Sequence, residues 1–108
     1  MKVKDNVYFE GPHEKYVGEL HLERYSFNDR IALSLVDTSE GFAEPIAFCT
    51  VCVPGIPLNE DQVIIKNYSE NQGMLKSLID QEIIANPTSY VNGFVTLYVC
   101  DLLIPIPE

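Results

Sequence analysis

Two stretches of alternating apolar and polar residues, separated by a short turn, constrain the fold of this 108-residue chain most strongly. In residues 17–27, Leu20 and Leu22 alternate with polar and charged residues, and in residues 30–36 three aliphatic side chains share one side. An alternation with a period of two predicts strands that have one face in the core. The sequence FNDR between them favours a turn, because Asn and Asp side chains hydrogen-bond their own backbone. The two stretches are therefore predicted to form a β-hairpin.

The remaining patterns predict a mixed fold. Short strands are expected at residues 3–9, 46–53, 62–66 and 94–100, and one helix at about residues 70–83. The run IAFCTVCV (46–53) is apolar on both faces, which is typical of a central strand, whereas NPTSYVNG (86–93) is expected to be a turn. The chain is long enough for one core without cross-links. We expect α+β architecture in a single domain, residues 1–108, with a mostly antiparallel sheet of about five to six short strands and one α-helix.

The start of the predicted helix lies in KNYSENQGMLKSL, residues 66–78. Ser69 and Gln72 have the S-x-x-Q spacing of a capping box, which satisfies free backbone donors. Five residues give the helix an apolar stripe (Met74, Leu75, Leu78, Ile79 and Ile83), and three are expected to face water (Lys76, Asp80 and Gln81). Gly73 falls inside the predicted helix, where glycine is less stable than alanine. Either another backbone packs closely against it or a partner protein does.

Charge restricts the partners. Seven Lys and Arg against 16 Asp and Glu give a net charge of −9. Such a chain repels nucleic acid and anionic lipid and attracts basic surfaces, so we expect no direct nucleic-acid or membrane binding. Three cysteines, an odd number, indicate reduced thiols. No signal peptide is expected, because the first residues lack an apolar core, and no apolar run reaches the length that spans a membrane. A cytoplasmic protein is expected.

No arrangement of residues predicts catalysis, a cofactor or a metal. Cys49 and Cys52 have C-x-x-C spacing, but in a strand residues three apart point to opposite faces, so core positions are favoured. Glu19, His21 and Glu23 share one strand face, where convergence on one ion is difficult; a solvated face is the simpler interpretation. A small enzyme or metal protein that uses these residues remains an alternative.

The C-terminal two-thirds carries a resemblance. EPIAFCTVCVPGIPLNEDQVIIKNYSENQGMLKSLIDQEII, followed by VNGFVTLYVCDLL, resembles a family of small uncharacterised proteins of bacterial conjugative elements and phages, a domain of unknown function. The resemblance covers about residues 43–103 and brings no catalytic residues. It implies a mobile-element context, in which small acidic proteins often block host defences, as anti-restriction and anti-CRISPR proteins do.

We therefore expect a non-enzymatic, acidic protein-binding module that competes for the basic, nucleic-acid-binding surface of a host defence nuclease. The carboxylates expected to contact it are Glu19, Glu23 and Asp29. Further acids could extend that surface: Glu10, Glu14, Asp37, Glu40, Glu44, Glu60 and Asp61.

The alternative is an interaction accessory of a conjugative element without an anti-defence role, which uses apolar contacts at Tyr68, Asn71 and Gly73. An exposed edge strand leaves a homodimer open.

Overall fold

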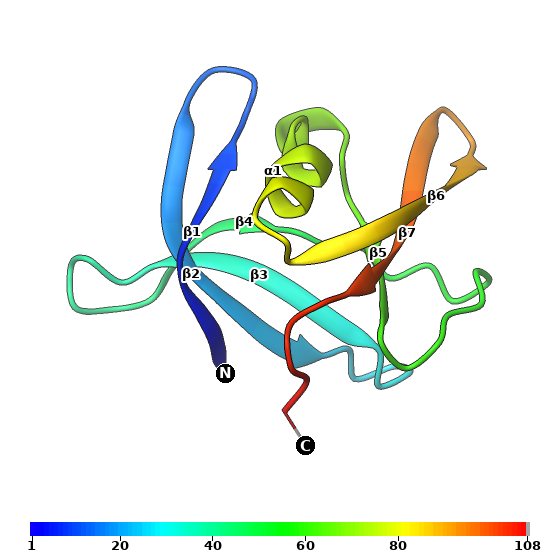
Figure 1. Ribbon diagram of the computed structural model, residues 1–108, viewed down its shortest axis with the longest axis horizontal. Coiled ribbons are helices and arrows are strands. Elements are labelled where there is room, and N and C mark those ends of the chain that lie inside the picture. Colours follow the sequence, from blue (N-terminus) through cyan, green and yellow to red (C-terminus); the bar gives the residue numbers. More distant parts are fainter. Residues whose placement is uncertain (108) are drawn as a thin grey trace.

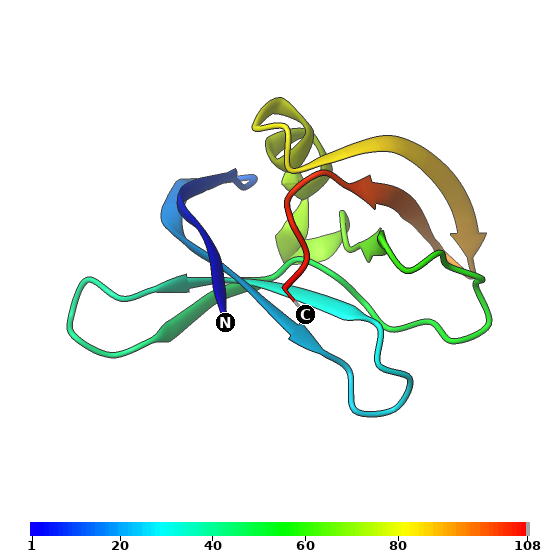
Figure 2. The ribbon, with the colours of Figure 1, turned by 60° about the horizontal axis from the view of Figure 1, so that its bottom comes forward.

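Seven antiparallel strands and one short α-helix make up the fold, which confirms the α+β prediction; the computed structural model describes residues 1–107 (Figure 1). The strands form two sheets rather than one. Sheet A has the order β1-β2-β3-β4, with β1 Lys2–Glu10, β2 Lys15–Arg24, β3 Ile31–Asp37 and β4 Glu44–Phe48. Sheet B has the order β5-β7-β6, with β5 Gln62–Ile65, β6 Ile84–Asn92 and β7 Val95–Leu102. Figure 2 shows sheet A on one side of the molecule and α1 with sheet B on the other.

The predicted hairpin is β2–β3. Leu20 lies opposite Leu35 and Leu22 opposite Leu33, and all four side chains are buried. The period-two pattern therefore places its aliphatic residues on the core face of sheet A, as predicted.

The predicted central strand at residues 46–53 is divided in two. Its first part is β4, an edge strand, where Phe48 is 67% exposed. After it, Cys49 donates its N–H to the Leu33 carbonyl (2.9 Å) and accepts from Lys66 N–H (2.9 Å), and Thr50 forms a bridge with Ile65. The residues that follow β4 thus join sheet A to sheet B, which is where the apolar character on both faces is needed.

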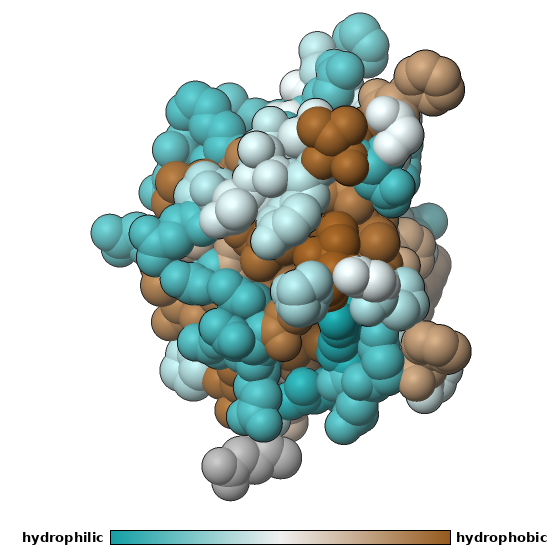
Figure 3. Space-filling view, turned by 90° about the vertical axis from the view of Figure 1, so that its right-hand side faces the viewer, coloured by the Kyte–Doolittle hydropathy of each residue, from teal (hydrophilic) through white to brown (hydrophobic). Residues whose placement is uncertain are grey.

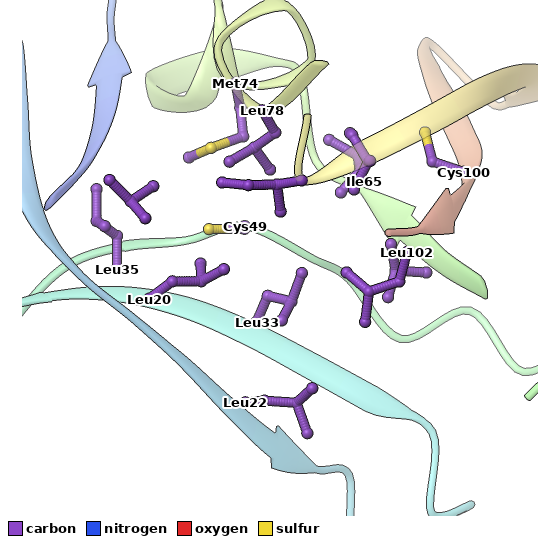
Figure 4. Packing of buried hydrophobic residues seen from close by; sticks show 14 of the residues in the cluster. Leu20, Leu22, Leu33, Leu35, Cys49, Ile65, Met74, Leu78, Cys100 and Leu102 are labelled. Carbon is purple, nitrogen blue, oxygen red and sulfur yellow. The ribbon is translucent and has the colours of Figure 1, made fainter. Parts of the chain in front are cut away.

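Helix α1 (Met74–Asp80) closes the core over sheet A. Met74 and Leu78 point from the helix toward Leu20, Leu35 and Cys49, while residues of β5 and β7 fill the other end (Figure 4). Full burial of one such aliphatic side chain contributes about 1.5–3 kcal/mol. Cys49 belongs to this cluster, so its prediction as a core residue is confirmed, whereas Cys52 is only half-buried and belongs to neither apolar cluster. Cys100, on β7, is also part of this cluster.

The predicted capping box is wrong. Ser69 opens a separate 3₁₀ turn (Ser69–Asn71) with φ 54°, and no side chain caps that turn. The α-helix begins only at Met74, after Gly73 with φ 98°. The capping oxygen is instead Asn67 Oδ1, which accepts from Leu75 N–H (2.8 Å). The helix is therefore shorter than the predicted 70–83.

Side chains of α1 and of its C-cap residue Gln81 cover the free edge of β1 near its end, at Tyr8 and Glu10. Tyr8 N–H donates to Gln81 Oε1 (2.9 Å), and Gln81 Nε2 donates to the Tyr8 carbonyl (2.8 Å). Glu10 N–H donates to Ser77 Oγ (3.0 Å). The Gln81 amide thus occupies the place of a neighbouring strand's peptide group, and the prediction that it faces water is wrong. The edge of β1 is thus blocked to other chains at Tyr8 and Glu10.

Strand β6 occupies most of the segment predicted as a turn, residues 86–93. It pairs with β7 through a two-residue loop, Gly93–Phe94, in which Gly93 has φ 66°. A glycine with positive φ at the first loop position fits a type II′ hairpin. On the outer face of sheet B, Ile56, Ile64, Leu97 and Val99 form a second, smaller apolar cluster. No helix within residues 1–107 is long and apolar enough to cross a membrane.

Candidate protein-binding surface

The row Glu19, His21 and Glu23 lies on the outer face of β2, since the intervening Leu20 points into the core. His21 Nε2 lies 3.1 Å from Glu19 Oε2, and Thr38 Oγ1 donates to Glu19 Oε1 at 3.1 Å. The hydrogen bond from His21, and secondarily that from Thr38, lowers the pKa of the Glu19 carboxyl. Glu19 is thus held by its neighbours and is half-buried.

Positive charges compensate the same row. The amino group of Met1 forms an ion pair with Glu23, and its hydrogen bond is the largest cause that lowers the pKa of the Glu23 carboxyl. Lys2 is the register partner of His21 on the adjacent strand. A phosphate mimic needs carboxylates that are free to pair with the partner's cations. The row therefore presents less free negative charge than its sequence indicates.

Asp29 does not extend the row. It is exposed in the β2–β3 turn with φ 61° and lines, with Glu23 and Glu60, an open groove of about 980 Å³. Arg24 and Arg30 line the same groove, and the Arg30 guanidinium donates to two main-chain carbonyls of residues 53–56 at 3.0 and 2.6 Å. The structure thus brings Glu23 and Asp29 to one groove of mixed charge and leaves Glu19 outside it.

Asn71 is unavailable to a partner. It is 1% exposed, and its Nδ2 donates to the carbonyls of Phe48 (2.6 Å) and Lys66 (3.2 Å). A buried amide paired in this way fixes the chain between sheet A and the helix. The prediction that it contacts a partner is therefore wrong.

Gly73 is also explained by the fold. A Cβ at this position would lie 2.1 Å from the Glu10 carbonyl oxygen, so the backbone of β1 is the close neighbour that the sequence left unidentified. Tyr68 is half-buried against the second apolar cluster, with the Lys66 ammonium 5.4 Å from its ring centre. The three positions of the alternative interface do not form one exposed surface.

The most anionic part of the chain is the loop that joins β3 to β4 together with the strand residue on each side of it. Residues 31–65 contain five acidic residues and no Lys or Arg. Three of the five lie at residues 37–44, which we call the acidic hairpin: Asp37, Glu40 and Glu44. Glu19 adjoins it through the hydrogen bond from Thr38. No ion pair involves these three acids within residues 1–107, so this surface keeps its charge.

Two exposed aromatic side chains accompany the acidic hairpin. Phe42, at its tip, is 61% exposed, and Phe48, on the following strand, is 67% exposed. Ser39 N–H donates to Asp37 Oδ1 (2.9 Å), a bond that orders the turn and is the main cause of the lowered pKa of Asp37. Aromatic side chains are enriched in protein-binding surfaces, where charged residues such as these acids belong to the polar rim. The sequence identified the acids, but nothing in it separated these aromatics from core residues.

The groups capable of chemistry are dispersed or buried. Residues 1–107 hold no group of three His, Cys, Asp or Glu side chains placed to bind a metal ion. Burial raises the pKa of Cys49 to about 12 and that of Cys100 to about 12. These two thiols stay protonated near neutral pH, and a thiol in that state is a poor nucleophile.

Comparison of the chain with protein-family models, with curated proteins and with solved structures found no match.

Proposed function

We propose that this chain is a non-enzymatic protein-binding module, and that its acidic hairpin occupies a basic surface on a nucleic-acid-binding defence enzyme of a bacterial host. The observation that carries the proposal is the uncompensated charge of residues 37–44 around the exposed Phe42. The defence class follows from the family resemblance over residues 43–103. The site of action would be the cytoplasm, where free thiols such as the three of this chain stay reduced.

The proposed mechanism is competition. The carboxylates of Glu40 and Glu44 pair with lysines and arginines that otherwise hold phosphate, and Phe42 inserts between them as an apolar anchor. Exposed charge pairs are screened by salt, so binding weakens as ionic strength rises. The anchor supplies the part of the affinity that salt does not remove. Glu19 supports this surface from β2 through Thr38.

The test is affinity capture from a nuclease-treated bacterial lysate, washed with a series of salt concentrations and read by mass spectrometry. The parent is compared with the double variant Glu40→Lys/Glu44→Lys and with the control Glu14→Lys/Asp61→Lys. Each substitution adds two charge units, so both doubles have a net charge of −5 instead of −9. The control acids are exposed and lie outside the hairpin.

We expect the parent and the control to retain a nucleic-acid-binding defence enzyme that elutes as salt rises, and the hairpin variant to lose it. Phe42→Ala should lower the salt concentration needed for elution. Equal loss in both doubles would show that only net charge matters and would contradict the hairpin. A captured protein that does not bind nucleic acid, or that an added oligonucleotide fails to displace, would contradict the competitive mechanism.

A further inference from the structure

Strand β6 has a free edge. It is the outermost strand of sheet B and pairs with β7 alone within residues 1–107. Its first half is blocked, because Asn86 (φ 55°) and Pro87 lie at the irregularity between Ala85 and Thr88. Proteins usually protect edges with such bulges and prolines, or with charges. Residues 88–92 continue as a regular exposed strand with none of these.

The hairpin that contains this edge is uncharged. Residues 83–100 include no Asp, Glu, Lys or Arg, in a chain that has 23 of them. Tyr90, Val91 and Phe94 are exposed, Val91 to 81%. Apolar side chains gather on the face of the molecule at the β6–β7 side, with hydrophilic ones around them (Figure 3). A chain of net charge −9 therefore offers one segment that does not repel a second copy of itself.

The free backbone groups of this edge can be identified from the hairpin. Asn92 and Val95 flank the two-residue loop and form a hydrogen-bonded pair, after which hydrogen-bonded and non-bonded pairs alternate. Tyr90 therefore bonds β7, whereas the N–H and C=O groups of Ser89 and Val91 point to the free edge. Among residues 1–107, no other segment bonds them.

We propose that two copies of this chain pair antiparallel along β6, about a twofold axis at Tyr90. In this register Ser89 lies opposite Val91 of the partner subunit in both directions, which forms about four main-chain hydrogen bonds. The two Tyr90 rings lie side by side on the face that carries Leu97 and the second apolar cluster. Sheet B of each copy continues into that of the other.

Charge favours a second copy over a basic partner at this site. A basic protein gains no ion pair from a segment without acids, and its affinity would be directed to the acidic hairpin instead. Two copies repel each other through their net charge, and the β6 edge is a contact that places no like charges opposite each other. The pairing is self-complementary, as a twofold interface requires.

Sedimentation velocity across a concentration series tests the pairing, with the parent expected at twice the 12.2 kDa mass of the chain. Tyr90→Lys and Tyr90→Glu each place like charges opposite each other and should sediment as monomers. A mixture of the two should recover the dimer mass, because Lys then faces Glu across the axis. Phe27→Lys, which replaces an exposed turn aromatic elsewhere, should remain dimeric.

A backbone variant tests the hydrogen bonds themselves. Ser89→Pro removes an N–H that points to the free edge and leaves the hydrogen bonds between β6 and β7 intact. This variant should be monomeric and keep the circular dichroism spectrum of the parent. The control Ser89→Ala should stay dimeric. A monomeric parent at every concentration, or a dimer that survives both Tyr90→Lys and Ser89→Pro, would overturn the proposal.

Discussion

Replacement of Gly73 by Ala tests how the helix docks on β1. Two penalties combine at this position. An L-residue at φ 98° costs about 1–2 kcal/mol relative to glycine. The new Cβ would also lie 2.1 Å from the Glu10 carbonyl oxygen, so the two backbones must separate. Overpacking of this kind costs about 1–3 kcal/mol.

Separation of the two backbones also weakens the Glu10 N–H···Ser77 Oγ hydrogen bond (3.0 Å), whose net contribution to stability is about 0.5–1.5 kcal/mol. We therefore expect Gly73→Ala to lower the free energy of unfolding by about 2.5–6.5 kcal/mol, a large part of the roughly 5–15 kcal/mol typical of a domain. Urea denaturation followed by circular dichroism measures it from the transition midpoint and slope.

Two other glycines are matched controls. Gly41 has φ 88° but nothing within 4 Å of a built Cβ, so Gly41→Ala isolates the conformational penalty of about 1–2 kcal/mol. Gly55 has neither a positive φ nor a close neighbour, and Gly55→Ala should be neutral or stabilise by up to about 1 kcal/mol. If the losses of unfolding free energy in Gly73→Ala and Gly41→Ala agree within about 0.5 kcal/mol, the close approach of Gly73 to β1 contributes nothing to the penalty, which contradicts the prediction.

Three further outcomes are expected. Asn71→Ala should lower the free energy of unfolding by about 1–3 kcal/mol, because two main-chain carbonyls lose their donor; unchanged urea unfolding would contradict this. Alkylation at mildly alkaline pH should label Cys52 alone, since burial raises the pKa of Cys49 and Cys100 to about 12. Early labelling of Cys49 or Cys100, measured by mass spectrometry, would contradict this prediction. Hydrogen bonds from two side-chain amides lower the pKa of the Asp101 carboxyl. The contribution of Asp101 to stability is therefore present above its unfolded pKa of about 4 and is lost as pH falls through the folded pKa. Asp101→Asn should flatten the dependence of the unfolding free energy on pH in that range.

The parts of the fold that local pattern decides were predictable. The β2–β3 hairpin follows from alternation over adjacent residues and a turn sequence between them, and its register needs no distant information. The helix start is different. Its capping oxygen belongs to Asn67 and its glycine is required by Glu10, which comes 63 residues earlier in the chain. A local capping box cannot compete with contacts made by a distant strand.

Strand β6 shows the same limit. Its residues Asn86, Pro87 and Ser89 are turn-formers by propensity, and only the pairing of Ala85 and residues 88–92 with β7 places this segment in a strand. The candidate surface was predicted in part: the acids follow from composition, whereas the compensation of Glu23 by the amino group and the exposure of Phe42 depend on which segments meet. Charge can be counted along a chain, but free charge depends on tertiary contacts.

The two proposed surfaces are spatially separate, and this makes their tests independent. The acidic hairpin and the β6–β7 hairpin lie at opposite ends of the longest axis of the molecule (Figures 1 and 2). A dimer through β6 would leave both acidic hairpins at its outer ends, free to contact two basic surfaces. Glu40→Lys/Glu44→Lys should therefore abolish capture without a change of sedimenting mass. Ser89→Pro should abolish the dimer and keep the affinity for a single basic site, while it loses the added avidity toward a partner that presents two.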